Sequence, residues 1–229
     1  MEQLNYSLKK EARLAGFFYL LCVLTGIYAM VYLPSKVDMN GSAGEVANHI
    51  ISNEFIFRVG ILTRLVSSIP WVLLSLSLYR LMKGVNGFQA KLMFAWMALS
   101  VPIGFIAESM NISALMIAKG ELLKSLDVVQ RSEYAFLFLK LHGYITSVSE
   151  LFWGLWLLPF GFLIYKSGFI PRILGVLLFL GGVSYIIEWV IFLAFPAYES
   201  SISSYRMLFG SVGEISIMLW LLIKGVKDK

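Results

Sequence analysis

Seven ionisable side chains lie inside apolar stretches that are long enough to cross a membrane. They are Arg58, Arg64, Glu108, His142, Glu150, Glu188 and Glu214. A charge in hydrocarbon costs several kcal/mol unless it is paired or hydrated, so such residues usually line a site or a water-filled cavity. Residues of these types could form ion pairs, relay protons or bind a charged ligand.

The depth of these groups in the membrane can be estimated from their position in each stretch. Counted from the basic end of the stretch, four of them lie fifteen to seventeen residues away, namely Arg64, Glu108, Glu150 and Glu188. Because a helix rises about 1.5 Å per residue, this distance is about 22–26 Å, within a hydrocarbon core about 30 Å thick. The same count places Glu214 at about 15 Å. The sequence therefore predicts a polar layer to which five helices each contribute one ionisable group.

We expect this layer to be an interior cavity that opens toward the outside of the cell. Its predicted ligand-binding residues are Arg64, Glu108, Asn111, His142, Glu150, Trp153, Glu188 and Glu214. Four glutamates face two arginines and a histidine, and such an imbalance is costly at low dielectric. Either some glutamates stay protonated, or the site binds a proton, a metal ion or a molecule with a cationic or hydrogen-bond-donating head. The alternative is that Arg64 pairs with one glutamate and only holds helices together.

The composition explains which elements must position these residues. The chain has 229 residues, of which 59% are hydrophobic and 14% charged, whereas soluble domains are about half apolar and about a quarter charged. We therefore predict an all-α fold, a polytopic membrane helix bundle that forms a single transmembrane domain over residues 1–229. The net charge of +5 does not point to nucleic acid, because the basic residues lie between the apolar stretches.

Six transmembrane helices are predicted. Their approximate bounds are Ala12–Leu33, Phe57–Tyr79, Leu92–Ala118, Leu141–Tyr165, Ile173–Phe195 and Met207–Ile223. Each is close to the roughly 20 residues that a membrane helix needs. Pro70, Pro102 and Pro159 fall inside these stretches, where each removes a backbone hydrogen bond and favours a kink.

The basic residues of the loops predict the orientation of the bundle. Eleven lysines and arginines flank the helices on one side and five on the other. The positive-inside rule places the richer side in the cytoplasm, so both termini are expected there. We expect a multi-pass protein of the bacterial inner membrane, in contact with membrane lipids.

Two outer loops have helical patterns. In the first, Ser42 and Glu45 fit a capping box, and Val46, Ala47, Ile50 and Ile51 follow on one face. This pattern predicts a short interfacial helix, and the alternative is a solvated connector with a helical turn or two. In the second loop, Leu122, Leu123, Leu126 and Val129 have helical spacing and suggest a similar lid.

Several segments resemble a known family. They are ARLAGFFYLL (12–21), FRVGIL (57–62), LYRLMKGVN (78–86), LHGY (141–144), YKSGFIPRILGVLLFLGGVSYIIEW (165–189) and GEISIMLWLLIKGV (213–226). Together they resemble bacterial membrane proteins of domain of unknown function (DUF) family 4386, over nearly the whole chain. The resemblance implies a single six-helix membrane domain and assigns no catalytic residue.

Three classes of function remain open at this stage. The first is a protein that binds or transports a small solute, a cation or proton, or a lipid-like ligand, and the polar layer favours it. The second is a metal-dependent hydrolase that uses the glutamates and histidine, although no H-E-x-x-H or G-x-S-x-G motif is present. The third is a non-catalytic regulatory or structural partner in the membrane. We expect no resident cofactor, and the oligomeric state stays open.

Overall fold

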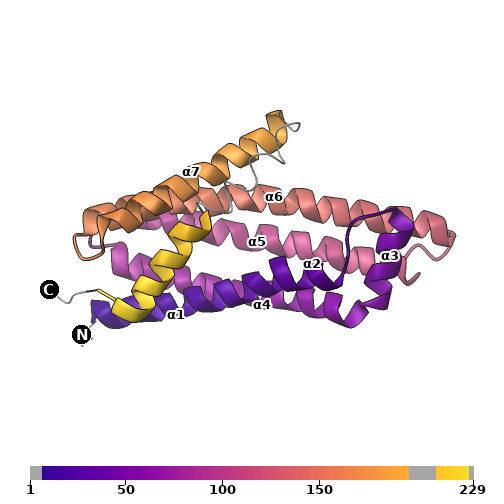
Figure 1. Cartoon of the computed structure of the whole chain (residues 1–229), viewed down its shortest axis with the longest axis horizontal. Helices are drawn as coiled ribbons and strands as arrows, with labels where there is room; N and C mark the ends of the chain where they lie inside the picture. Colours follow the sequence, from indigo (N-terminus) through magenta and orange to yellow (C-terminus); the bar gives the residue numbers. More distant parts are fainter. Residues whose placement is uncertain (1–6, 196–209, 227–229) are drawn as a thin grey trace. The chain divides into compact units, whose positions relative to one another are not determined.

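The computed structural model describes residues 7–195 and 210–226, and every regular element within them is helical (Figure 1). The elements in chain order are α1 (Leu8–Ile27), η1 (Tyr28–Tyr32), α2 (Leu33–Lys36), α3 (Ala43–Ser52), α4 (Glu54–Met82), α5 (Gly87–Ala118), α6 (Val128–Ser167) and α7 (Arg172–Ala194). A further helix covers residues 210–219 and continues into η3 (Trp220–Lys224). The predicted all-α class is confirmed.

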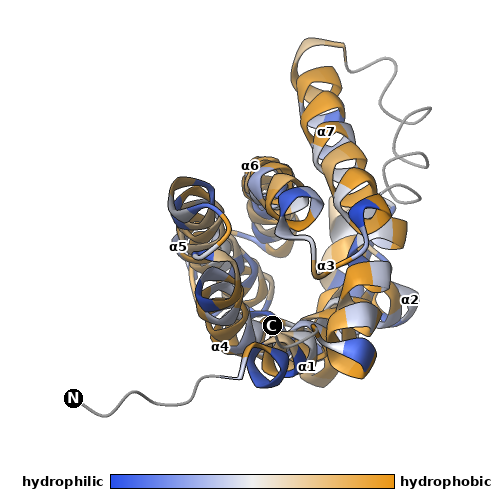
Figure 2. Cartoon of the chain, turned by 90° about the vertical axis from the view of Figure 1, so that its left-hand side faces the viewer, coloured by the Kyte–Doolittle hydropathy of each residue, from blue (hydrophilic) through white to orange (hydrophobic). Residues whose placement is uncertain are grey.

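Five helical stretches within the described residues are long and apolar enough to cross a membrane. They are Leu8–Lys36, Glu54–Met82, Gly87–Ala118, Val128–Ser167 and Arg172–Ala194, so the first five predicted spans are found. Figure 2 shows α7 as hydrophobic along most of its length, and its mean hydropathy reaches 2.2. The sixth predicted span, Met207–Ile223, begins outside the described residues. The protein is thus a polytopic membrane protein.

The chain forms two compact units. Unit 1 comprises Met1–Leu21, Ile69–Ser100 and Val148–Lys229, and unit 2 comprises Cys22–Ser68 and Val101–Ser147. The helices α1, α4, α5 and α6 contribute residues to both units. The single domain over residues 1–229 stays a prediction, and the two units are described separately below.

The core of unit 2 explains why α3 forms. The predicted capping box is confirmed, because Ser42 Oγ accepts from the Glu45 backbone and the Glu45 carboxylate accepts from Ser42 N at 2.7 Å. Val46 and Ile50 are fully buried in a cluster with Leu33 of α2, with Val37 and with residues of α4 and α5. Of the four apolar residues predicted to share a face, Ile51 alone is exposed. The helix therefore packs most of its apolar face on the protein, and its position at the membrane interface stays a prediction.

The expected lid in the second outer loop is wrong. Residues 119–127 form turns and bends, and α6 begins at Val128, well before the predicted Leu141. The reason is a cap at Asp127, whose carboxylate accepts from Gln130 N at 2.8 Å, while the Gln130 side chain accepts from Asp127 N at 3.2 Å. This reciprocal pair is the capping-box arrangement, and it starts a helix of 40 residues.

A π-helical turn interrupts the first span in unit 2. Within η1, Leu33 N donates to the Tyr28 carbonyl, five residues back. The next bond of this pattern would join residue 34 to the Ala29 carbonyl, but Pro34 has no N–H. The Ala29 carbonyl is therefore left for another donor.

In unit 1, four glycines bring the backbones of α6 and α7 together. A Cβ added to Gly161 would lie 2.6 Å from the Gly175 carbonyl oxygen, and one added to Gly154 would lie 2.8 Å from that of Gly182. Within each helix the two glycines are seven residues apart, so they follow one seam. Small residues at such a seam allow close packing of membrane helices. Pro159 lies between the two glycines of α6 and does not end the helix, as Pro70 and Pro102 do not end α4 and α5.

Candidate functional site

Four of the predicted site residues meet in unit 2. Arg64 Nη1 lies 3.5 Å from Glu108 Oε1, and His142 Nε2 lies 3.2 Å from the same oxygen. Asn111 Nδ2 donates to Glu108 Oε2 at 3.0 Å. The predicted pairing of Arg64 with a glutamate is confirmed, and its partner is Glu108.

Each residue of this cluster comes from a helix whose geometry fixes its position. Arg64 lies on α4 and His142 on α6, while Glu108 and Asn111 lie three residues apart on α5. Residues at this spacing share a helix face, so the amide can reach the carboxylate. Arg64 Nη2 donates to the Ala29 carbonyl at 3.1 Å, and thereby satisfies the acceptor that the π-turn and Pro34 leave open.

The ring nitrogen Nε2 of His142 lies between a hydrogen-bond donor, Arg64, and a hydrogen-bond acceptor, Glu108. It is 3.2 Å from Arg64 Nη1 and 3.2 Å from Glu108 Oε1. A guanidinium only donates and a carboxylate only accepts, so a single nitrogen cannot bond both at once. With a proton on Nε2 the ring donates to Glu108, and without it the ring accepts from Arg64. The position of one proton therefore selects the hydrogen bonds of the cluster.

A cavity of about 240 Å³ adjoins the cluster within unit 2. Its polar lining comes from Arg64, Asn111, Lys140 and His142. Its apolar lining comes from α2 and the segment after it, from α4 and from α6, through Leu33, Pro34, Val37, Met39, Phe57, Phe136 and Leu139. An apolar chamber with a few polar groups at one side is typical of a ligand pocket.

Lys140 was not among the predicted site residues. Its Nζ lies 4.9 Å from the centroid of the Phe136 ring, one turn earlier on α6, which is a cation–π contact. The signal was present in the sequence, because a lysine within an apolar run two residues before His142 is unusual in a membrane span. The helix prediction that started at Leu141 excluded it.

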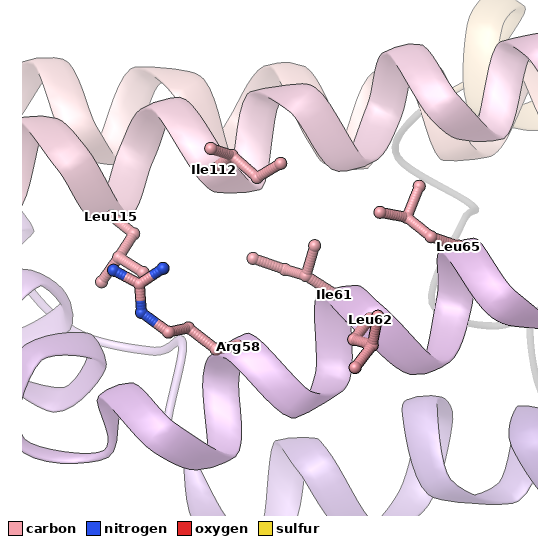
Figure 3. Close-up of a pocket in the computed structure, with 6 residues that line it drawn as sticks. All are labelled: Arg58, Ile61, Leu62, Leu65, Ile112 and Leu115. Atoms are coloured by element: carbon pink, nitrogen blue, oxygen red, sulfur yellow. The ribbon is translucent and has the colours of Figure 1, made fainter.

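A second pocket of about 200 Å³ lies between α4 and α5 in unit 2. Figure 3 shows Ile61 and Leu65 on α4 pointing toward α5, which carries Ile112 and Leu115, with the guanidinium of Arg58 near Leu115. Leu62 also lines this pocket. Arg58 Nε donates to Glu54 Oε1 at 2.7 Å. This pocket is almost wholly apolar and contains no member of the Glu108 cluster.

In unit 1, the predicted Glu214 has two tyrosine partners. Tyr19 Oη donates to Glu214 Oε2 at 2.7 Å, and Tyr185 Oη lies 3.3 Å from Oε1. Tyr19 is buried, and its ring packs at 6.2 Å from Trp156. The involvement of Tyr19 was missed, since a tyrosine in a long apolar helix is usually a membrane-interface or packing residue.

The remaining predicted site residues, Glu150, Trp153 and Glu188, lie in unit 1 and are partly buried. That these three residues line one cavity together with Glu108, Asn111 and His142 stays a prediction, since the two sets belong to different units. Within residues 7–195 and 210–226, no three His, Cys, Asp or Glu side chains lie close enough to hold a metal ion.

Residues 14–225 match the family described as "Domain of unknown function (DUF4386)". The chain belongs to this family. The resemblance inferred from sequence segments is thus confirmed, and membership in the DUF4386 family extends over both units.

A relative is known from Archaeoglobus fulgidus, where it is described as an uncharacterized protein. It is 39% identical over 83 residues, which are 36% of this chain and 48% of the relative. The match therefore spans about half the length of the relative. No solved structure matches the chain.

Proposed function

We propose that this DUF4386 protein binds a small, partly apolar ligand in the cavity of unit 2. One observation carries the proposal, namely that Arg64, Asn111, His142 and Lys140 border a chamber whose other lining residues are apolar. An amphiphilic ligand would place its polar head at these four residues and its hydrocarbon part against Phe57, Leu139 and their neighbours.

The competing structural role is less well supported. An Arg–Glu pair that only joins helices needs no adjoining space, since membrane helix interfaces are stabilised by close packing. Here Arg64 of the pair borders about 240 Å³ of space, and polar groups that border such space are suited to recognition. Transport of the ligand is the more specific form of this proposal.

We place the protein in the inner membrane of a bacterial cell, with six spans and both termini in the cytoplasm. The argument is the bias of eleven basic loop residues against five. Single cysteines introduced at Lys83 and Lys124, with Cys22 replaced, should react with an impermeant reagent from opposite sides of the membrane. Reaction of both from the same side would refute this topology.

The binding proposal can be tested by filling the cavity. Leu139→Trp places a larger side chain in the cavity lining, whereas Leu137→Trp adds the same ring to an exposed position of the same helix. Native mass spectrometry and titration with octyl-chain amphiphiles in lipid nanodiscs would measure binding. We expect the wild type and Leu137→Trp to bind one molecule and Leu139→Trp to lose binding. Equal binding by all three proteins would refute the proposal.

A further inference from the structure

The charges around the unit 2 cavity indicate which kind of head group it would hold. Among the described residues that line the cavity, two are permanently basic, one is a histidine, one is an asparagine and none is acidic. The total number of glutamates in the predicted spans favours a cationic ligand. The side chains that border this cavity favour the opposite sign.

One hydrogen-bond donor of Arg64, its Nε, has no partner among the described residues. Its Nη1 and Nη2 atoms are engaged by Glu108, His142 and the Ala29 carbonyl. Its Nε is buried and has no acceptor in the part of the chain that the structure describes. A buried donor without a partner is unfavourable. The guanidinium that carries it belongs to the cavity lining, so an anionic group in the cavity would lie beside its positive charge.

Lys140 supplies a second cation. Its Nζ lies over the Phe136 ring at 4.9 Å, and no ion pair joins it to an acidic group within residues 7–195 and 210–226. The side chain is exposed at its helix position and belongs to the cavity lining. It is therefore available to a ligand while its ammonium group lies over an aromatic ring.

Glu108 does not cancel this positive charge. Arg64 and Lys140 carry two charges, and Glu108 carries one of opposite sign, so the set has a surplus of one positive charge before His142 is counted. Both Glu108 oxygens already face donors, from Arg64 and His142 at Oε1 and from Asn111 at Oε2. A single anionic group would therefore neutralise the surplus.

We infer that the cavity binds an anionic amphiphile, a carboxylate or phosphate head with a hydrocarbon tail, whose head lies between Lys140 and Arg64. This inference rests on the proposed ligand-binding function and names its ligand class. The apolar walls supply the tail site, through Phe57, Phe136 and Leu139 among others. Charge-assisted hydrogen bonds from both cations would hold the head.

A series of probes with one tail and different heads tests the sign of the charge. Octanoate, octyl phosphate, 1-octanol and octylammonium would be titrated calorimetrically into wild-type protein in zwitterionic nanodiscs, with empty nanodiscs as the reference. We expect the two anions to bind about tenfold more tightly than 1-octanol, and octylammonium most weakly. Equal or tighter binding of octylammonium would overturn the inference, while binding of none of the probes would contradict the proposed function itself.

Lys140 offers the most informative variant, because an exposed side chain can be replaced without disturbing the core. Lys140→Gln should weaken octanoate binding about three- to tenfold and leave 1-octanol unchanged. Lys140→Glu should reverse the preference between octanoate and octylammonium. Lys124→Gln removes a lysine from the 119–127 loop, outside the cavity lining, and should behave as wild type. An unchanged octanoate affinity in Lys140→Gln would refute the role of this residue.

The same assay separates the two sources of such a head group. If a free acid is the occupant, octanoate should bind equally well in nanodiscs of zwitterionic and anionic phospholipid. If the headgroup of an anionic phospholipid is the occupant, anionic nanodiscs should compete and weaken octanoate binding. Either result agrees with an anionic head, and inorganic phosphate, which lacks a tail, should bind much more weakly than octyl phosphate.

Discussion

Two carboxylates, Glu108 in unit 2 and Glu214 in unit 1, are stabilised by different partners. Glu108 lies beside a guanidinium, an imidazole and an amide. Glu214 receives hydrogen bonds from the hydroxyls of Tyr19 and Tyr185. No lysine, arginine or histidine in the described residues forms an ion pair with Glu214.

The difference lies in which protonation states each arrangement accepts. A guanidinium can only donate, so Arg64 requires an accepting oxygen on Glu108. A phenol can donate or accept, so the two tyrosines can hold Glu214 either as a carboxylate or as a neutral acid. The cluster in unit 2 therefore depends on charge, whereas the arrangement in unit 1 depends on hydrogen bonding. This contrast can be tested at each position.

The largest effect is expected from Arg64→Leu, which leaves the Glu108 carboxylate buried without its cation. Breaking a buried pair in this way typically costs about 3–5 kcal/mol, so the unfolding midpoint in lipid nanodiscs should fall strongly. Adding Glu108→Gln should restore part of the loss, because the uncompensated charge is removed. Arg58→Leu, which breaks an exposed pair with Glu54, serves as the control and should change stability little. Strictly additive effects of the two core substitutions would show that the pair is not coupled.

The second test compares the same substitution at the two carboxylates. Glu108→Gln leaves Arg64 without a counter-charge and should cost about 2–4 kcal/mol. Glu214→Gln keeps an amide oxygen that can accept from Tyr19, so its cost should stay below about 1 kcal/mol. Denaturant unfolding of both variants in one lipid mixture measures the difference. Equal losses would contradict the distinction between charge and hydrogen bonding.

A smaller effect is expected from removal of one hydroxyl in unit 1. Tyr19→Phe deletes the donor at 2.7 Å from Glu214 and should destabilise the protein by about 1–2 kcal/mol, as for other buried polar groups that lose a partner. Tyr185→Phe removes a longer contact of 3.3 Å and should cost less. Thermal unfolding ranks the two variants, and a larger loss for Tyr185→Phe would contradict the assigned geometry.

The smallest effect concerns a third carboxylate, Glu45, which is exposed in the first turn of α3. Hydrogen bonds from the Ser42 backbone and then from the Ser42 side chain hold the pKa of Glu45 below its ordinary value of 4.5. A carboxyl group with a lowered folded-state pKa stabilises the fold above its unfolded-state pKa, and this contribution is lost as the pH falls through the folded-state pKa.

We therefore expect α3 to open more readily as the pH drops below about 4.5. Hydrogen exchange of residues 43–52, measured against pH, would detect this opening. Glu45→Gln, which cannot titrate, should remove the pH dependence that the wild type shows. The same pH dependence in both proteins would assign the effect to another group.

Much of the architecture could be predicted from the sequence because hydrophobic length is a direct consequence of membrane thickness. The first five spans and the Ser42–Glu45 cap followed from such local rules. The start of α6 did not, since the Asp127–Gln130 cap carries no apolar signal and the helical extension after it contains the charged residues Arg131, Glu133 and Lys140.

The sequence could predict which ionisable residues belong to candidate sites, but not which of these residues lie together. The cost of burying a charge identified Arg64, Glu108 and His142. Residue counts give depth, but the rotation of each helix about its axis decides which side chains meet, and an apolar stretch carries little information on rotation. For this reason the partner of Glu214 proved to be Tyr19, 195 positions away in the chain.

The glycine contacts between α6 and α7 also fix how far these two helices can slide along each other. A shift by one residue would bring a side chain of the neighbouring position against a backbone carbonyl, where even a methyl group would lie within 2.6–2.8 Å. The helix pair thus has a defined register, joined by the turn in which Gly168 adopts a φ of +74°. The relative heights of Glu150 and Glu188 are consequently set by backbone contact, and a thicker or thinner bilayer should tilt the pair as a whole without changing the offset between the two acids.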